Sequence, residues 1–313
     1  MIGIVGAGAF GMALATALCR EGREVGLWGR DVGMLARSRS NEARLPGVVL
    51  PESVNVLNDI GALAGAKVIL LALPMQALRG FLQVYAAQIA GPPLVACCKG
   101  IDLVSLRGPS AVIAAACPAS AVSVLTGPSF AADIARGLPT ALTLAGENAS
   151  LQQLLSTPSL RLYRSTDIIG AELGGALKNV IAIGAGVVIG AGLGDSARAA
   201  LMTRGYAEML RLALTLGARA ETLAGLSGFG DLVLTCTSAQ SRNFRFGQTI
   251  GAQSEFDPNI TVEGAATARA VANIALQSSM DMPITSMIAA LIDKKIALAD
   301  AIQALLSRPL KQE

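Results

Sequence analysis

The chain of 313 residues contains no histidine. Without an imidazole it cannot build a Ser-His-Asp triad, a His-ligated zinc site or the His-Asp proton relay of lactate-type dehydrogenases. Any general base in this protein must therefore be a lysine, an aspartate, a glutamate, a tyrosine or a cysteine.

Charged residues are also scarce, at 15% of the chain against 52% for hydrophobic residues. In soluble domains about a quarter of all residues are usually charged. We therefore expect an unusually large share of this chain's surface to be buried, in a core or between subunits. A homodimer is compatible with that composition. The net charge is +3, and no basic block is interleaved with aromatic residues. We therefore expect a small anionic ligand and no nucleic-acid partner.

The five cysteines lack the spacing of a metal site, so no metal is expected. They are Cys19, Cys97, Cys98, Cys117 and Cys236. Their odd number and scattered positions are typical of reduced core thiols. No targeting leader precedes the first apolar run, which predicts a cytoplasmic protein.

Three long uncharged stretches do not predict a membrane span. Residues 108–132 and 80–98 are each interrupted by prolines, and residues 179–194 are glycine-rich and shorter than the roughly 20 residues that a bilayer requires. We interpret all three as buried strands and helices, without stable membrane insertion.

A glycine-rich turn follows the first apolar run, residues 1–5, and leads into a helical pattern at residues 12–20. Its glycines allow a tight turn, a close approach of a pyrophosphate and close helix packing, while the helix N-terminus holds phosphate. The predicted dinucleotide site consists of Gly6, Gly8, Ala9, Phe10 and Gly11. A turn without a ligand, or a methyltransferase loop, would have a similar sequence.

The second expected strand, residues 23–28, ends in Gly29 and Arg30. A protein specific for NAD usually has an acidic residue there for the ribose 2′-hydroxyl, whereas an arginine suits the 2′-phosphate of NADP. Arg30 therefore favours NADPH, although NAD stays open as the cofactor.

Strands alternate with helices in the first half, and the helical period dominates afterwards. Further strands are expected at 54–57, 67–73, 94–98 and 121–125, with edge strands of uncertain direction at 140–144 and 160–164. Helices are expected at 168–194, 196–216, 242–251, 262–280 and 300–306. The fold class is α/β: a Rossmann-type doubly wound sheet domain (1–165) followed by an all-α substrate domain (166–313), as in 6-phosphogluconate dehydrogenase.

Ligands of such sheets bind at the carboxyl ends of the strands. Lys99 directly follows the expected strand at 94–98 and could pair with a phosphate. It could instead be an ordinary strand-end lysine that points into solvent. Gly127 and Ser129 follow the next strand and open another helix, where they could bind an anion or simply cap the helix.

Lys178 lies in the most apolar helical stretch, beside Asn179. Burial lowers the pKa of a lysine and makes it a credible base, although the stem of a lysine can also extend to solvent. Asn179 could orient the substrate or nicotinamide. Asp231 could bond the amine of Lys178, or cap a helix.

The densest polar region of the helical half lies between residues 231 and 243. It adds Thr235, Ser241, Arg242 and Asn243 to the candidate substrate site, with Arg242 suited to bidentate phosphate binding. Glu263 could contact a ribose or cap a helix, and Arg245 is expected to be solvated.

Together these segments resemble the bacterial-type NAD(P)-dependent sn-glycerol-3-phosphate dehydrogenase family over nearly the whole chain. The resemblance rests on residues 6–11, 27–31, 98–100, 125–131, 174–183, 230–236, 241–243 and 262–264. This chain departs from the family pattern at Ala9 and Phe10, where Ser and then Trp or Tyr are usual. It is also somewhat shorter than the family pattern between Glu255 and Ile260. A hydroxyl contact to phosphate is therefore missing, while the backbone donors remain.

The resemblance implies reversible oxidation of sn-glycerol 3-phosphate at C2 to dihydroxyacetone phosphate, a reaction that supplies the glycerol backbone of phospholipids, with Lys178 as the proton acceptor. It places Lys99, Gly127, Ser129, Asp231, Ser241, Arg242 and Asn243 at the substrate. It places Ala9, Phe10, Arg30, Lys99, Ala131, Arg242, Thr261 and Glu263 at the cofactor. The alternatives are a β-hydroxyacid dehydrogenase of the 6-phosphogluconate type and a non-catalytic NADPH sensor.

Overall fold

The computed structural model describes residues 1–306, which pack as two units. The first unit comprises Met1–Gly175 and Ala213–Asp231, and the second comprises Ala176–Leu212 and the chain from Leu232 onward. The division by packing falls inside a long helix, and a domain boundary at residue 165 stays a prediction.

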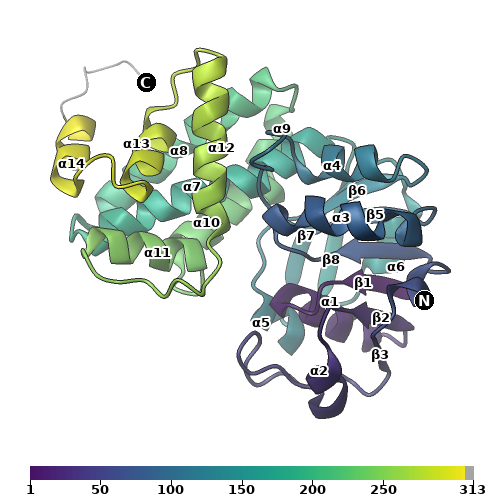
Figure 1. Ribbon diagram of the computed structural model, residues 1–313. Helices are drawn as coiled ribbons and strands as arrows, with labels where there is room; N and C mark the ends of the chain where they lie inside the picture. The colour runs from purple at the N-terminus through teal and green to yellow at the C-terminus, as the bar shows by residue number, and fades with distance from the viewer. Residues whose placement is uncertain (307–313) are drawn as a thin grey trace. The chain divides into compact units, whose positions relative to one another are not determined.

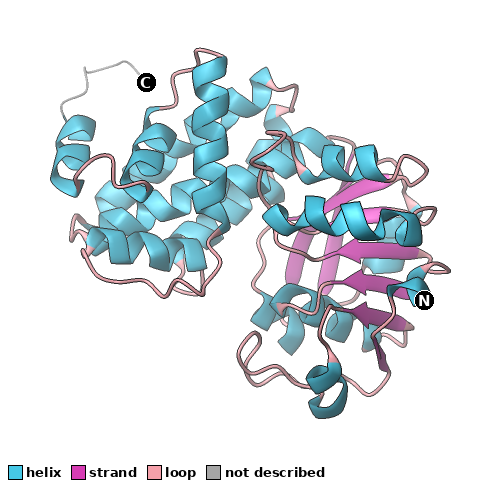
Figure 2. Cartoon of the chain, in the orientation of Figure 1, coloured by secondary structure: helices cyan, strands magenta, loops and turns pink. Residues whose placement is uncertain are grey.

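A sheet of eight strands forms the centre of the first unit (Figures 1 and 2). The strands are β1 (Ile2–Val5), β2 (Val25–Trp28), β3 (Val54–Leu57), β4 (Val68–Leu71), β5 (Leu94–Ala96), β6 (Val122–Thr126), β7 (Thr140–Ala145) and β8 (Leu160–Ser165). Their order is β3-β2-β1-β4-β5-β6-β7-β8. The strand order reverses at β1, and doubly wound sheets bind their ligands at such a switch point. The predicted fold class is confirmed.

The two late strands run in the same direction, opposite to that of the six earlier strands. Strand β7 pairs antiparallel with β6, whereas β8 pairs parallel with β7. Both late strands therefore run antiparallel to the rest of the sheet, and β8 forms its edge. All the earlier pairs are parallel, and β1, β2, β4 and β5 are buried along their whole length, as strands covered on both faces should be.

Helices cover both faces of this sheet. Those of the first unit are α1 (Ala9–Cys19), α2 (Gly33–Ser38), η1 (Ile60–Leu63), α3 (Met75–Ile89), α4 (Pro109–Ala116), α5 (Ala131–Arg136), α6 (Ser150–Leu155), α9 (Ala220–Ala224) and η2 (Leu226–Gly230). One apolar core lies between the sheet and α1 with α5, and the other between the opposite face and α3 with α4 (Figure 1).

The second unit is helical throughout its described part. It contains α10 (Asp231–Thr237), α11 (Arg242–Gly251), α12 (Glu263–Gln277), α13 (Pro283–Ile292) and α14 (Leu298–Leu306), with most of α7 (Ile168–Gly190) and α8 (Gly194–Thr215). Among the described residues, α7 is the one helix long and apolar enough to cross a membrane. Its most apolar window is 89% buried inside the protein, as expected of a core helix.

The segment before α10 is not the flexible turn that its glycines predict. Residues Leu226–Gly230 form a π-helix, η2, which continues directly into α10. Gly228 allows this tight path because a Cβ atom there would lie 2.0 Å from the carbonyl oxygen of Leu223. Single π turns of this kind are frequent at functional sites.

Candidate active site

The glycine-rich turn between β1 and α1 has the geometry of a phosphate cradle. A Cβ at Gly6 would lie 2.4 Å from the carbonyl oxygen of Ala72, and a Cβ at Gly11 would lie 1.9 Å from that of Gly6, so neither can be replaced without moving backbone. No atom lies within 4 Å of a Cβ at Gly8, which caps α1 without a side-chain bond. The turn therefore leaves space and helix N–H groups for a pyrophosphate.

The other predicted cofactor residues of this unit lie at neighbouring positions. Ala9 and Phe10 start α1 and pack, with Ala131 of α5, against the core on that side of the sheet. Arg30 is exposed two residues beyond the end of β2, the neighbour of β1. The residues present fit a dinucleotide along β1 and β2.

A largely buried ion pair lies between Lys99, three residues beyond β5, and Asp231, the first residue of α10. The Lys99 ammonium donates to Asp231 Oδ2 at 2.6 Å and to the Gly127 carbonyl oxygen at 3.0 Å. The side chain of Asp231 is 1% exposed and that of Lys99 15%. Gly127 adopts φ +136°, and the Ser129 hydroxyl donates to its carbonyl oxygen at 3.2 Å. Four predicted substrate residues are thus joined in one cluster.

Sequence reasoning missed two residues beside this cluster. Thr126 is the last residue of β6, and a Cβ at Gly175 of α7 would lie 2.5 Å from its hydroxyl oxygen. The Lys99 side chain approaches the same Cβ position to 3.6 Å. Gly175 therefore lets α7 pack closely on Thr126 at the end of β6, next to the Lys99 side chain. Its place beside Gly174 in an apolar helix was the available signal.

The loop after Lys99 is fixed to α3. Asp102 is 3% exposed and accepts hydrogen bonds from the guanidinium of Arg79 and from the backbone and hydroxyl of Ser105. Burial alone would raise the pKa of Asp102, but these donors outweigh it and lower the pKa to about 2. Gln76 donates to the Ile101 carbonyl at 2.8 Å. This network holds the loop that follows Lys99.

In the second unit, Lys178 is buried within α7, with 6% of its surface exposed. Its ammonium donates to the Thr235 hydroxyl at 2.7 Å, and Thr235 of α10 is 3% exposed. The structure thus places Lys178, the residue that the sequence predicts to be the base, inside the helical unit and next to the Thr235 hydroxyl.

The residue after Lys178 starts a chain of amides. Asn243 Nδ2 donates to Asn179 Oδ1 at 2.9 Å, and Asn243 Oδ1 accepts from the Gly264 N–H at 2.9 Å. This connects α7 and α11 with the start of α12, whose first residue is Glu263. Asn179, Asn243 and Glu263 are therefore held at one place by the fold.

The remaining candidates lie at the ends of the same helices. Ser241 caps α11 and accepts from the Phe244 N–H at 3.1 Å, and Arg242 is exposed at the first position of that helix. Thr261 is exposed just before α12. Asp231 forms a salt bridge with Lys99 and is the first residue of α10, and its expected bond to the Lys178 amine stays a prediction.

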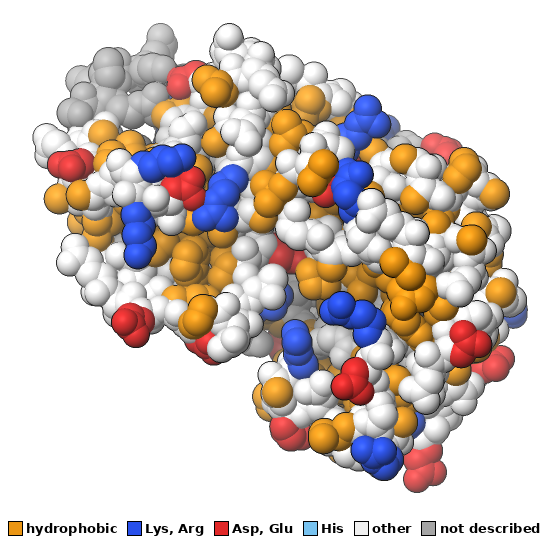
Figure 3. Space-filling view, in the orientation of Figure 1, with side chains coloured by type: hydrophobic (Ala, Val, Ile, Leu, Met, Phe, Trp, Pro, Cys, Tyr) orange, Lys and Arg blue, Asp and Glu red, His pale blue; other side chains and the backbone are white. Residues whose placement is uncertain are grey.

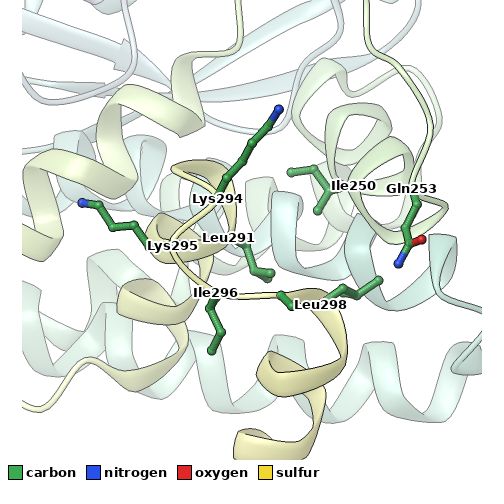
Figure 4. A pocket seen from close by; sticks show the side chains of 8 residues that line it. Ile250, Gln253, Leu291, Lys294, Lys295, Ile296 and Leu298 are labelled. Carbon is green, nitrogen blue, oxygen red and sulfur yellow. The ribbon is translucent and has the colours of Figure 1, made fainter.

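A separate hollow of about 440 Å³ in the second unit contains none of the predicted site residues (Figure 4). It is lined by Ile250, Gln253, Leu291, Lys294, Lys295, Ile296, Ala297 and Leu298. The side chains of Lys294 and Lys295 point away from one another there, and Lys295 pairs with Asp293 at 3.2 Å. On the face seen in Figure 3, charged side chains of both signs are interspersed, as the small net charge predicts.

Comparison with known proteins relates both halves of the chain to one family. Residues 1–152 match the model of the NAD-dependent glycerol-3-phosphate dehydrogenase N-terminus, and residues 167–303 match that of its C-terminus. A glycerol-3-phosphate dehydrogenase (NAD(P)+) of Cereibacter sphaeroides is 64% identical, covering 100% of each chain. Its counterpart in Paracoccus denitrificans is 58% identical, covering 100% of this chain and 99% of the other.

A solved structure is similar along nearly the whole chain. The crystal structure of glycerol-3-phosphate dehydrogenase from Coxiella burnetii has a TM-score of 0.92 and 36% identity, and 98% of each chain is covered. The structure of D-mandelate dehydrogenase with NADH, at a TM-score of 0.63 and 15% identity, shares the fold alone.

Proposed function

The chain belongs to the family of NAD-dependent glycerol-3-phosphate dehydrogenases, and we propose that it interconverts sn-glycerol 3-phosphate and dihydroxyacetone phosphate with NAD(P). It is an oxidoreductase. In the direction of reduction it forms sn-glycerol 3-phosphate, which supplies the glycerol backbone of phospholipids. The observation that carries the proposal is Lys178, a buried amine in a chain that has no histidine to act as base.

In the proposed reaction, neutral Lys178 removes the proton from the C2 hydroxyl of glycerol 3-phosphate. A bound nicotinamide would supply the hydride acceptor for the same carbon. In the reverse direction the Lys178 ammonium protonates the oxygen that becomes the C2 hydroxyl. Thr235 holds the amine in place through its 2.7 Å hydrogen bond, and Asn179 orients the substrate.

The residues proposed to bind the substrate fall into two sets. Lys99, Gly127, Ser129 and Asp231 form one set, and Ser241, Arg242 and Asn243 form the other. Lys99 and Arg242 supply the positive charge, while Asp231 fixes the Lys99 ammonium through its 2.6 Å contact. Correct placement of C2 is worth several kcal/mol of the barrier, on the order of 7.

For the cofactor we propose Gly6, Gly8, Ala9, Phe10 and Gly11 at the pyrophosphate, with Arg30 at the 2′-phosphate of NADP. Ala131, Thr261 and Glu263 complete the set, with Lys99 and Arg242 shared with the substrate. The open space over Gly8 supports the first assignment. The exposed guanidinium of Arg30 beyond β2 supports the second.

We also propose that the protein acts in the cytoplasm as a homodimer, without membrane insertion. Its five cysteines are free thiols, as a reducing compartment favours. The small share of charged residues supports subunit contact. Light scattering of the purified protein measures the assembly directly.

The reaction is tested by mixing protein with dihydroxyacetone phosphate and NADPH, then NADH, and following the absorbance of the reduced nicotinamide. We expect oxidation by the wild type and a loss of about 100- to 10,000-fold in Lys178→Ala. Lys67→Ala, an exposed lysine before β4, is the matched control and should keep full activity. Tight NADPH binding without turnover in the wild type would reject the dehydrogenase assignment in favour of a sensor.

A further inference from the structure

Two adjacent glycines of α7, Gly174 and Gly175, contact two different segments of the sheet unit. A Cβ at Gly174 would lie 2.6 Å from the carbonyl oxygen of Ser227 in η2. A Cβ at Gly175 would lie 2.5 Å from the hydroxyl oxygen of Thr126, the last residue of β6. Neighbouring residues of a helix point about 100° apart, so a single turn of α7 packs against both segments.

These two segments hold the Lys99 ammonium. Gly127, which directly follows Thr126, accepts from it through the carbonyl oxygen at 3.0 Å. Asp231, which directly follows η2, accepts from it at 2.6 Å. The place of the ammonium therefore depends on how far apart the two segments lie. The Lys99 side chain itself approaches the Cβ position of Gly175 to 3.6 Å.

The end of β6 is also held by β7. Thr126 is paired with Thr143 of that strand, and a Cβ at Gly127 would lie 3.2 Å from Leu142. The Thr126 side chain is β-branched and only 2% of the residue is exposed, so it has little freedom to turn. A methyl group added at Gly175 would therefore push α7 away from the end of β6.

Thr126 contributes to this contact through its size. Its hydroxyl oxygen is buried and has no hydrogen-bond partner among residues 1–306. Without that oxygen, the nearest atoms to a Cβ at Gly175 would be Thr126 Cβ at 3.5 Å and Lys99 Cγ at 3.6 Å, which are ordinary contact distances. At Gly174 the obstructing atoms belong to the backbone, and no change of side chain removes them.

We propose that Gly174 and Gly175 position Lys99 for the substrate by fixing the two segments that hold its ammonium, with Thr126 as a further positioning residue. This inference rests on the proposed function, in which Lys99 binds the substrate phosphate. A misplaced ammonium forms a poorer charge-assisted hydrogen bond, and a displacement of about 1 Å can cost up to roughly 100-fold. None of the three positioning residues needs to touch the substrate.

The test is a double-variant cycle between α7 and β6. Calorimetry gives the Kd for sn-glycerol 3-phosphate with NADPH present, a pair of reduced compounds that cannot react. We expect Gly175→Ala to raise this Kd about tenfold. Adding Thr126→Ala should bring the Kd back to within about twofold of the wild type, because the obstructing oxygen is gone. Adding Thr126→Ala to Gly174→Ala should restore nothing, since the methyl group there meets backbone.

Gly80→Ala is the matched control. Gly80 lies within helix α3, and no neighbouring atom lies within 4 Å of a Cβ there. This variant gains the same helix propensity as Gly175→Ala, so it should raise the temperature of unfolding and leave the Kd unchanged. Since the variant with both Gly175→Ala and Thr126→Ala lacks the hydroxyl, recovery of its Kd also shows that the hydroxyl does not bind the substrate.

No recovery in that double variant would overturn the proposal. So would a Gly175→Ala variant that unfolds at a lower temperature but keeps its Kd within about twofold, because the contact would then be structural only. If Gly175→Ala does not fold, the double variant should fold, and its failure to do so would likewise overturn the contact. Substrate binding by a wild type that shows no turnover would reject the proposed function alone.

Discussion

Lys99 and Asp231 are 132 residues apart in the chain, yet the ammonium lies 2.6 Å from the carboxylate and both are largely buried. A buried pair of this kind adds little stability by itself, but the loss of one partner leaves an uncompensated charge. The main effect of the ion pair is therefore to hold Lys99 in place, where we propose that the substrate phosphate binds.

We expect Asp231→Asn to lower the free energy of unfolding by about 3 kcal/mol, because the Lys99 ammonium loses its buried counter-charge. The double variant Lys99→Met with Asp231→Leu should recover most of this loss, although it should be inactive. Urea unfolding of Lys99→Met, Asp231→Leu and the double variant gives the coupling energy. Strictly additive effects would contradict the buried pair.

Lys178→Arg separates charge from proton transfer. The guanidinium keeps a positive charge but cannot lose its proton at neutral pH, so it cannot act as a base. We expect the variant to be as inactive as Lys178→Ala while NADPH binding, measured by nicotinamide fluorescence, stays within about twofold. Retention of a tenth or so of the wild-type rate by the arginine variant would mean that Lys178 acts through its charge alone.

Thr235→Val removes the acceptor of the Lys178 amine while keeping its shape. We expect kcat to fall about tenfold, because the amine is less well oriented, with little change in KM for NADPH. Thr203→Val is the control, since the Thr203 hydroxyl bonds the Ala199 carbonyl on an exposed part of α8. An effect confined to KM would show that Thr235 binds the cofactor instead.

The sequence predicted the elements well where one pattern dominates. The glycine turn, the strand β3 and the bounds of α11 follow from apolar period and turn residues alone. Pairings between distant segments were harder: the salt bridge of Asp231 with Lys99 was not predicted, and the expected bond of Asp231 to the Lys178 amine stays a prediction. Either lysine could have been the partner of Asp231, because spacing along the chain does not determine which strand end a helix reaches.

The π-helix η2 was missed for a related reason. Its glycines and serine normally indicate a flexible turn. The conformation depends instead on close approach to other backbone: a Cβ at Gly174 of α7 would lie 2.6 Å from the Ser227 carbonyl oxygen. Such close contacts are a property of the assembled fold and leave no period in the sequence.

Glu172 of α7 should make stability depend on pH. Burial raises the pKa of its carboxyl to about 7, more than the hydrogen bonds from Ser110 lower it. The folded protein then keeps this proton while the unfolded chain has lost it, so the free energy of unfolding falls as pH rises from about 4.5 to about 7.

Glu172→Gln should remove this part of the pH dependence and stabilise the protein at pH 8 by about 1 to 3 kcal/mol. The amide oxygen can still accept from the Ser110 N–H, which the carboxyl does now. Thermal unfolding across that pH range measures the slope. The surface variant Glu147→Gln controls for the loss of one charge, and an equal change of slope in both variants would contradict the assignment.

Asp102 acts in the opposite direction. With its pKa lowered to about 2, it stabilises the fold above pH 3.8 or so, and this contribution is lost as pH falls toward 2. Asp102→Asn should lower the free energy of unfolding at neutral pH by about 1 to 2 kcal/mol, a figure reduced because Arg79 is partly exposed to solvent. The variant should also unfold less steeply in acid, and an unchanged acid transition would contradict the prediction.

Arg30 tests the cofactor preference, since it lies exposed just beyond β2, where we propose that the 2′-phosphate of NADP binds. Arg30→Ala should raise KM for NADPH about 10- to 100-fold, because a charge-assisted hydrogen bond to phosphate is lost. KM for NADH should change little, since NADH has a hydroxyl in place of that phosphate. Arg136→Ala, at the exposed end of α5, controls for a general loss of positive charge. If KM rose equally for both cofactors, Arg30 would contact a part that they share, and the preference for NADPH would need another residue.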